Sequence, residues 1–228
     1  MSADRLLQRY AERDASPALS GFWRLSNPVA LALAQQRERA VLGLLGEAGL
    51  DLGEQRLLDL GCGTGMEFAQ YLRWGARRAH WIGVDLIGAR LQQAQANWGG
   101  GVAQASGAAL PFADASFDFV VQNVVFSSIV EVELRRRVAA ELLRVLSPGG
   151  HLLWYDMARA HPHDPHLRDV SEHELRALFP GLRWTLRRLT PHLGLLKRVE
   201  RLAGWPGMQL LMASGLWRTH LLGLGRKP

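Results

Sequence analysis

The sequence predicts a doubly wound α/β fold built on a mostly parallel sheet. From residue 56 onward, short apolar runs alternate with segments of helical periodicity, with one strand for roughly every 20 to 35 residues. Strands spaced in this way pair in parallel, and the helices between them cover both faces of the sheet. A length of 228 residues suits one such domain with a small appendage.

Two helices are predicted before the sheet begins. Residues 28–48 repeat apolar side chains at helical spacing behind the helix start Asn27-Pro28, and a shorter helix is expected over residues 3–13. We therefore divide the chain into an N-terminal helical lid or cap, residues 1–50, and a main domain, residues 51–228. The aromatic residues Tyr10, Phe22 and Trp23 suit either a lid over a ligand or ordinary core packing, and Tyr10 is a candidate substrate contact.

Seven strands are expected in the main domain, at residues 56–60, 80–86, 101–105, 117–126, 149–157, 182–190 and 216–226. Helices are expected up to residue 74 and over residues 88–97, 131–146 and 171–179, the last with Ser171 and Glu174 as a capping box. The residues Arg135, Arg136 and Arg137 are predicted to form a solvated outer face. Residues 190–213 form an insertion on the substrate side whose structure the pattern leaves open.

Charge and cysteine content narrow the function classes. Residues 161–228 carry 11 Lys and Arg against 5 Asp and Glu, whereas the first 160 residues are balanced at 16 each. The single cysteine, Cys62, excludes an intrachain disulfide and fits a small packing residue. Neither a signal peptide nor an apolar membrane span is indicated, so we expect a cytoplasmic protein.

A glycine-rich turn follows the first strand in the stretch "LLDLGCGTG". Gly61, Gly63 and Gly65 stand where a strand gives way to a helix, a place where bare backbone can approach a ligand closely. The dinucleotide fingerprint would need its third glycine at Met66, and Asp59 would repel a pyrophosphate. A ligand that carries positive charge suits this turn better.

Four motifs in order resemble class I S-adenosylmethionine-dependent methyltransferases over residues 54–157. They are "DLGCGTG", "HWIGVDL" ending in Asp85, "LPFADASFD" and "RVLSPGG". The resemblance implies a Rossmann-like sheet of seven strands with an antiparallel last strand. It also implies S-adenosylmethionine as cofactor, S-adenosylhomocysteine as its product, and no metal.

The same resemblance assigns a cofactor site residue by residue. Asp59 would support the methionine end, Asp85 the ribose hydroxyls and Leu86 the adenine. Ser106 replaces the aspartate that many relatives direct at the adenine amino group. The remaining cofactor contacts expected are Gly61, Gly63, Thr64, Gly65, Gly107, Ala108 and Gln122.

The acceptor should arrive over the carboxyl ends of the fourth and fifth strands. Phe126 and Asp156 are predicted substrate contacts, and Tyr155 and His163 are candidates for holding or deprotonating the acceptor. His163 belongs to the run "HPHDPH", for which a plain solvated loop is the main expectation and a metal site the further alternative.

The predicted function is methyl transfer to a small molecule or a glycan- or lipid-linked acceptor in a bacterial biosynthetic pathway. Two alternatives stay open. The basic C-terminal segment would suit an RNA methyltransferase, although no RNA-binding module is recognisable. A protein that binds the cofactor without transferring its methyl group would show the same glycine turn. The acceptor atom and the oligomeric state are not predicted.

Overall fold

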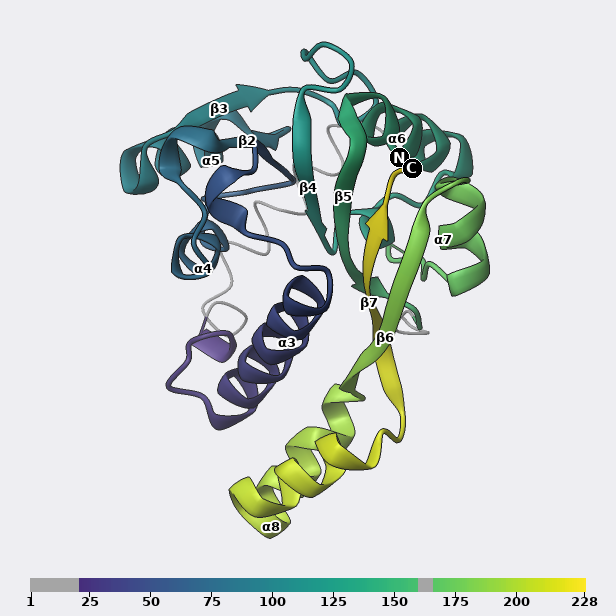
Figure 1. Cartoon of the computed structure of the whole chain (residues 1–228). Coiled ribbons are helices and arrows are strands. Elements are labelled where there is room, and N and C mark those ends of the chain that lie inside the picture. The colour runs from purple at the N-terminus through teal and green to yellow at the C-terminus, as the bar shows by residue number, and fades with distance from the viewer. Residues whose placement is uncertain (1–20, 160–165) are drawn as a thin grey trace.

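The computed structural model describes residues 21–159 and 166–228, which contain a seven-stranded sheet in the order β3-β2-β1-β4-β5-β7-β6 (Figure 1). Pairing is parallel from β3 through β5, and β7 runs antiparallel to both β5 and β6. The predicted doubly wound sheet with an antiparallel last strand is therefore confirmed. The strands are β1 Leu57–Leu60, β2 Trp81–Asp85, β3 Gly101–Gln104, β4 Phe117–Asn123, β5 Leu146–Met157, β6 Arg183–Pro191 and β7 Arg218–Arg226.

Helices cover both faces of the sheet, as the alternation of strands and helices requires. One face packs against α3 (Pro28–Glu47), α4 (Phe68–Arg73) and α5 (Gly88–Trp98), and the other against α6 (Val132–Val145) and α7 (Glu172–Leu178). Short 3₁₀ turns lie at η1 (Leu52–Glu54), η2 (Arg78–His80) and η3 (Phe126–Ser128). No helix within the described residues is both long and apolar enough to cross a bilayer.

The N-terminal helix α3 begins where the sequence predicts. The Asn27 side chain accepts a hydrogen bond from the Val29 amide at 2.9 Å, and Pro28 occupies the first turn, where its missing amide proton costs nothing. The helix buries Val41 and Leu44 against the sheet. Its role as a lid stays a prediction.

The insertion after β6 is the helix α8 (Leu193–Ser214), broken at Gly204, where φ is +55°. One face of α8 packs on the start of α3 through a small cluster that joins Leu196, Met208 and Met212 to Val29 and Ala32. Figure 1 shows α8 extending beyond the carboxyl ends of the parallel strands.

For Arg135, the predicted solvated position on α6 is wrong. Its side chain is fully buried, and it forms an ion pair with Glu174 of α7 at 2.8 Å. Glu174 therefore does not complete the capping box, of which only the Ser171 hydroxyl contact to the Glu174 amide forms, at 3.1 Å. Arg136 is exposed, as predicted, and pairs with Glu133.

Candidate functional site

The glycine turn after β1 needs its three glycines for different reasons. All three have positive φ, +73° at Gly61, +54° at Gly63 and +74° at Gly65. A Cβ atom on Gly61 would stand 2.6 Å from Val125 Cγ2, and one on Gly65 would stand 2.7 Å from Trp98 Cδ1. A Cβ on Gly63 would meet no atom within 4 Å. Gly63 is therefore the point where bare backbone borders open space.

Asp85 ties the end of β2 to this turn. One carboxylate oxygen accepts a hydrogen bond from the Gly63 amide at 2.9 Å, and the other accepts from the Ile87 amide at 2.9 Å. Both oxygens retain a second lone pair, and the residue is only half-buried, so further donors can reach it. Leu86 follows, with its carbonyl fixed by the Gln104 side chain at 3.0 Å.

Asp59 lies beneath the turn as a buried carboxylate. It is 2% exposed, and its Oδ2 atom has no hydrogen-bond partner among the described residues. Burial, and then the nearby Glu67, raise the pKa of Asp59 well above its usual range. A positively charged ligand would offset this cost, so the orphaned oxygen fits the sulfonium and ammonium groups of S-adenosylmethionine.

The turn after β3 holds the residues expected to face the adenine. The Ser106 hydroxyl is exposed and accepts a hydrogen bond from the Ala108 amide at 3.2 Å. A Cβ on Gly107 would stand 3.2 Å from Leu60 Cδ1, so this turn packs closely on the end of β1. Thr64, inside the glycine turn, is half-buried. The structure thus brings Asp85, Ser106 and the glycine turn to one edge of the sheet.

The loop after β4 is strained and anchored. Val124 has φ of +55°, a conformation that a β-branched side chain resists, and its amide donates to the Tyr155 carbonyl at 2.8 Å. The Gln122 side chain is fully buried and accepts from the Val125 amide at 3.2 Å. Gln122 therefore holds the loop on which Val125 contacts the glycine turn.

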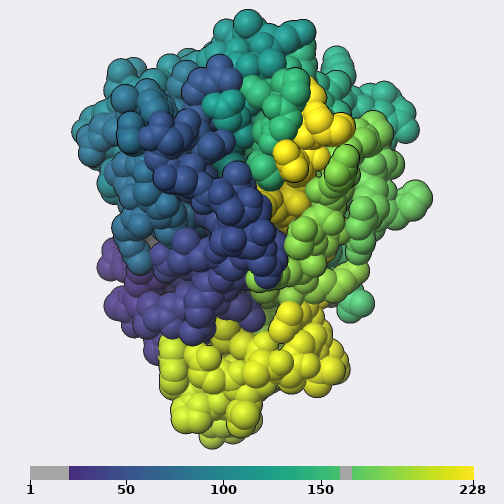
Figure 2. Space-filling view, viewed as in Figure 1, coloured from purple at the N-terminus to yellow at the C-terminus, as the bar shows by residue number. Residues whose placement is uncertain are grey.

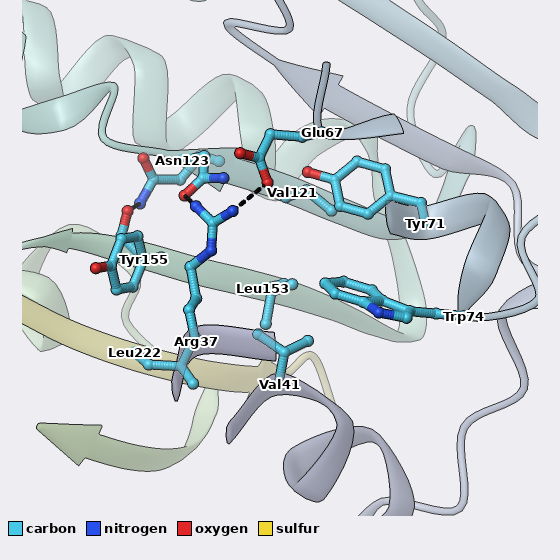
Figure 3. Close-up of a pocket in the computed structure, with 11 residues that line it drawn as sticks. Arg37, Val41, Glu67, Tyr71, Trp74, Val121, Asn123, Leu153, Tyr155 and Leu222 are labelled. Carbon is cyan, nitrogen blue, oxygen red and sulfur yellow. Dashed lines mark hydrogen bonds and ion pairs between the residues drawn. The ribbon is translucent and has the colours of Figure 1, made fainter. Parts of the chain in front are cut away.

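A narrow cleft lies beside this loop, between α3, α4 and the ends of β4 and β5 (Figure 3). The Arg37 guanidinium crosses it, paired with Glu67 at 2.5 Å, close to Asn123 Oδ1 at 3.4 Å and 5.4 Å from the Tyr155 ring centroid. The buried Tyr71 hydroxyl at its wall has no hydrogen-bond partner among the described residues. Charged and hydrogen-bonding groups therefore line this cleft, whose volume of about 10 Å³ admits about one water molecule.

The surroundings of Tyr155 do not favour a role in proton transfer. Its hydroxyl lies 2.6 Å from Thr190 Oγ1, and burial raises its pKa above the usual value. Its ring stacks on His220 of β7, with centroids 5.0 Å apart. Tyr155 fits a wall of the cleft better than the base that the sequence suggests.

The environment of His220 fixes its tautomer. Thr219 Oγ1 donates its proton to the Thr190 carbonyl at 3.0 Å and so can only accept from His220 Nδ1, at 2.9 Å. Nε2 of the neutral ring then carries the lone pair. Burial, and then Arg37, lower the pKa of His220 to about 4, so the ring is neutral at pH 7.

We expect His220→Asn to change how stability depends on pH. Below pH 6.5 the unfolded chain protonates this histidine first, so the wild type loses stability as the pH falls through 6.5 toward about 4. Relative to the variant, the loss should be about 2 kcal/mol, after discounting for solvent access to the half-buried ring. Urea titrations of both proteins at pH 7 and pH 4 measure the difference, and equal pH profiles would contradict the buried neutral ring.

Two predicted substrate contacts are core residues instead. Phe126 is fully buried and packs on Trp154 at 4.8 Å and Phe179 at 5.8 Å, measured between ring centroids. Asp156 is also fully buried, and it accepts the Phe126 amide at 2.9 Å and the Ser127 amide at 3.2 Å. Burial raises the pKa of Asp156 to about 6. Neither side chain lies where an acceptor could touch it.

Tyr10 and His163 lie outside the described residues, as do His161 and Asp164. Within residues 21–159 and 166–228, no three His, Cys, Asp or Glu side chains gather as a metal site. Cys62 is buried against Gly83, which agrees with its prediction as a packing residue, and burial raises the pKa of its thiol.

The sequence reading missed Arg37, Glu67, Thr190 and His220. Each is an ordinary residue in its own helix, strand or turn, without a motif. The cluster forms only when α3, the start of α4, β6 and β7 meet around Tyr155 of β5. The strained backbone at Thr190, where φ is +60°, gives no sequence signal because threonine is not a typical residue for that conformation.

Comparisons with known proteins agree with this geometry. Residues 58–154 match the family described as "Methyltransferase domain". A malonyl-[acyl-carrier protein] O-methyltransferase of Erwinia billingiae is 37% identical over 111 residues, which are 48% of this chain and 42% of that protein. A probable tRNA methyltransferase 9B of Mus musculus is 36% identical over 97 residues, 42% of this chain and 20% of that protein.

The chain thus aligns with less than half the length of either of these curated relatives. Among solved structures, an S-adenosylmethionine-dependent methyltransferase from Mesorhizobium loti has a TM-score of 0.58 at 20% identity, covering 81% of this chain and 96% of that chain. This likeness supports the fold. The family match includes the glycine turn and Asp85, whereas Arg37, Tyr155 and His220 lie outside it.

Proposed function

We propose that this chain, whose residues 58–154 match the family described as "Methyltransferase domain", is a class I S-adenosylmethionine-dependent methyltransferase that transfers a methyl group to a small-molecule acceptor. The observation that carries the proposal is the open backbone at Gly63 between the Asp85 carboxylate and the orphaned oxygen of Asp59. The one cysteine of the sequence, Cys62, is free and buried, which fits a reducing compartment, and we propose the cytoplasm as the location.

We assign each cofactor-binding role to a residue at the carboxyl ends of the parallel strands. Asp85 would accept hydrogen bonds from the ribose hydroxyls, Leu86 would flank the adenine, and Ser106 with the backbone of Gly107 and Ala108 would bond its edge. Asp59 would balance the positive charge of the methionine end, next to the backbone of Thr64 and Gly65.

The bound cofactor supplies a methyl group on a positively charged sulfur that is already activated for transfer. The protein then has to align the acceptor and exclude water. Gln122 positions the loop that meets the glycine turn, and Arg37 of α3 pairs with Glu67, the residue before α4, at the cleft. Where an acceptor must lose a proton, His220 Nε2 would be a candidate to accept it, because burial keeps this ring neutral at pH 7.

We expect Asp85→Ala to weaken S-adenosylhomocysteine binding about 30-fold, because the ribose hydroxyls would lose their charged acceptor and the Gly63 amide its partner. Isothermal titration calorimetry measures the affinity of both proteins, and circular dichroism checks that the variant folds. Asp118→Ala serves as control, since this half-buried carboxylate pairs with Arg56 at the opposite edge of the sheet. Unchanged affinity in Asp85→Ala would remove the proposed site.

An RNA acceptor is the second candidate, favoured by the 11 cationic residues within residues 161–228 and by the tRNA methyltransferase among the similar proteins. Loss of heparin retention at modest salt together with no RNA-dependent turnover would exclude it. Cofactor that co-purifies without methylated product over a broad acceptor panel would instead indicate a binding protein.

A further inference from the structure

The α8 insertion is a bent helix, and the proposed function assigns no role to it. Gly204 and Pro206 divide it into two halves, and these halves pack closely, because a Cβ on Gly207 would stand 2.4 Å from Ala203 Cβ. Its inward side chains, Leu196, Met208 and Met212, are already buried. Figures 1 and 2 show α8 projecting at the bottom of the molecule, as its outermost part in that direction.

Large apolar side chains also point outward from this helix. Leu202 is 87% exposed, Trp205 39% and Leu210 74%, and we call these three residues the α8 patch. Leu202 and Trp205 flank the bend at Gly204, so they stand at the tip of the projection. Exposed groups of this kind on a soluble domain mark contact with a partner or a lipid surface.

Positive charge surrounds the α8 patch. Lys197, Arg198 and Arg201 are exposed, and none of them forms an ion pair with another described residue. Lys197 lies 4.3 Å from the Phe22 ring centroid, and Glu200 is the one acidic residue of α8. Cations without an acidic partner among the described residues, next to exposed leucine and tryptophan, match a surface that carries negative charge outside and apolar groups beneath.

We propose that the tip of α8 binds an anionic lipid surface. Leu202 and Trp205 would enter at headgroup level, where tryptophan is favoured, and Lys197, Arg198 and Arg201 would lie on the anionic headgroups. A protein partner would have to supply both an acidic rim and an apolar pocket, whereas an anionic bilayer supplies both at any point. The proposal is independent of methyl transfer, because it needs neither cofactor nor acceptor.

Flotation of the full chain with vesicles tests this proposal. We expect binding to phosphatidylcholine vesicles that contain phosphatidylglycerol, weak binding to pure phosphatidylcholine, and loss of binding at high salt. Arg198→Gln with Arg201→Gln should weaken binding about 30-fold at low salt, from about 1 kcal/mol per cation. Leu202→Ser with Trp205→Ser should weaken it at least tenfold.

Leu42→Ser is the matched control, since Leu42 is an exposed leucine, 43% accessible, on α3. It should bind vesicles like the wild type, and all variants should keep the S-adenosylhomocysteine affinity of the wild type, which shows that they are folded. No binding to anionic vesicles, or equal binding by the wild type and the Leu202/Trp205 variant, would overturn the proposal. A dimer in light scattering that the same variant abolishes would assign the α8 patch to a second copy instead.

Discussion

Arg135→Ala is expected to reduce the free energy of unfolding by about 3–5 kcal/mol. The guanidinium is fully buried and donates to the Ile129 carbonyl at 2.6 Å, the Arg168 carbonyl at 2.7 Å, the Asp169 carbonyl at 3.1 Å and the Glu174 carboxylate at 2.8 Å. Truncation leaves the three carbonyls without this donor, and Glu174 keeps Arg168, at the longer distance of 3.5 Å, as its cationic partner among the described residues.

The neighbouring Arg136→Ala gives the matched control. Arg136 is 65% exposed, and its ion pair among the described residues is with the exposed Glu133, so its loss should cost under about 0.5 kcal/mol. Urea unfolding of both variants at pH 7 makes the comparison, and thermal midpoints should separate by roughly 10 °C for a chain of this size. Similar losses in both variants would contradict the role of Arg135 as the junction between α6, α7 and the segment at residues 168–169.

Arg135 also shows where sequence reasoning reaches its limit. Its position on α6 is local information, and three consecutive arginines in a helix are typical of a solvated face. Its partners lie up to 39 residues further along the chain, and only the packing of α7 on α6 brings them together. An arginine that joins distant carbonyls has the same sequence signature as an exposed one.

The fold and the glycine turn were predictable because their signals are contiguous. Strands and crossover helices alternate along the chain, and "DLGCGTG" places its acid and its three glycines within seven residues. In the structure these residues stay together, and Asp85 joins them because parallel strands end at the same edge of a sheet.

The residues around the cleft at the ends of β4 and β5 were harder to predict, and the geometry of a strand explains why. Successive side chains of a strand point to opposite faces, so Tyr155 and Asp156 cannot both line one cleft. Tyr155 faces α3, and Asp156 faces the core beneath η3. Only the structure determines which face carries the cleft, and it adds Arg37 and His220 from segments that lie far away in the sequence.

Gly63→Ala is expected to weaken S-adenosylhomocysteine binding about 100-fold, which is close to 2.7 kcal/mol. The new Cβ meets no protein atom within 4 Å, so the fold accommodates it, and the cost of an alanine at φ of +54° should be about 1–2 kcal/mol of stability. If the cofactor lies against this backbone, the methyl group occupies its space directly. The expected loss of affinity is therefore much larger than the strain alone explains.

Two other glycines separate the effect of strain from the effect on the ligand. Gly149 also has positive φ, +75°, and open space at its Cβ position, but it lies at the amino end of β5, so Gly149→Ala should cost similar stability and leave affinity unchanged. Gly65→Ala brings its Cβ within 2.7 Å of Trp98, so it should lower stability more than either. Calorimetric titration with S-adenosylhomocysteine and thermal unfolding of all three variants decide the matter. If Gly63→Ala binds within about threefold of the wild type (about 0.7 kcal/mol), the cofactor cannot lie on this side of the turn, because a ligand in van der Waals contact with Gly63 would collide with the added methyl group.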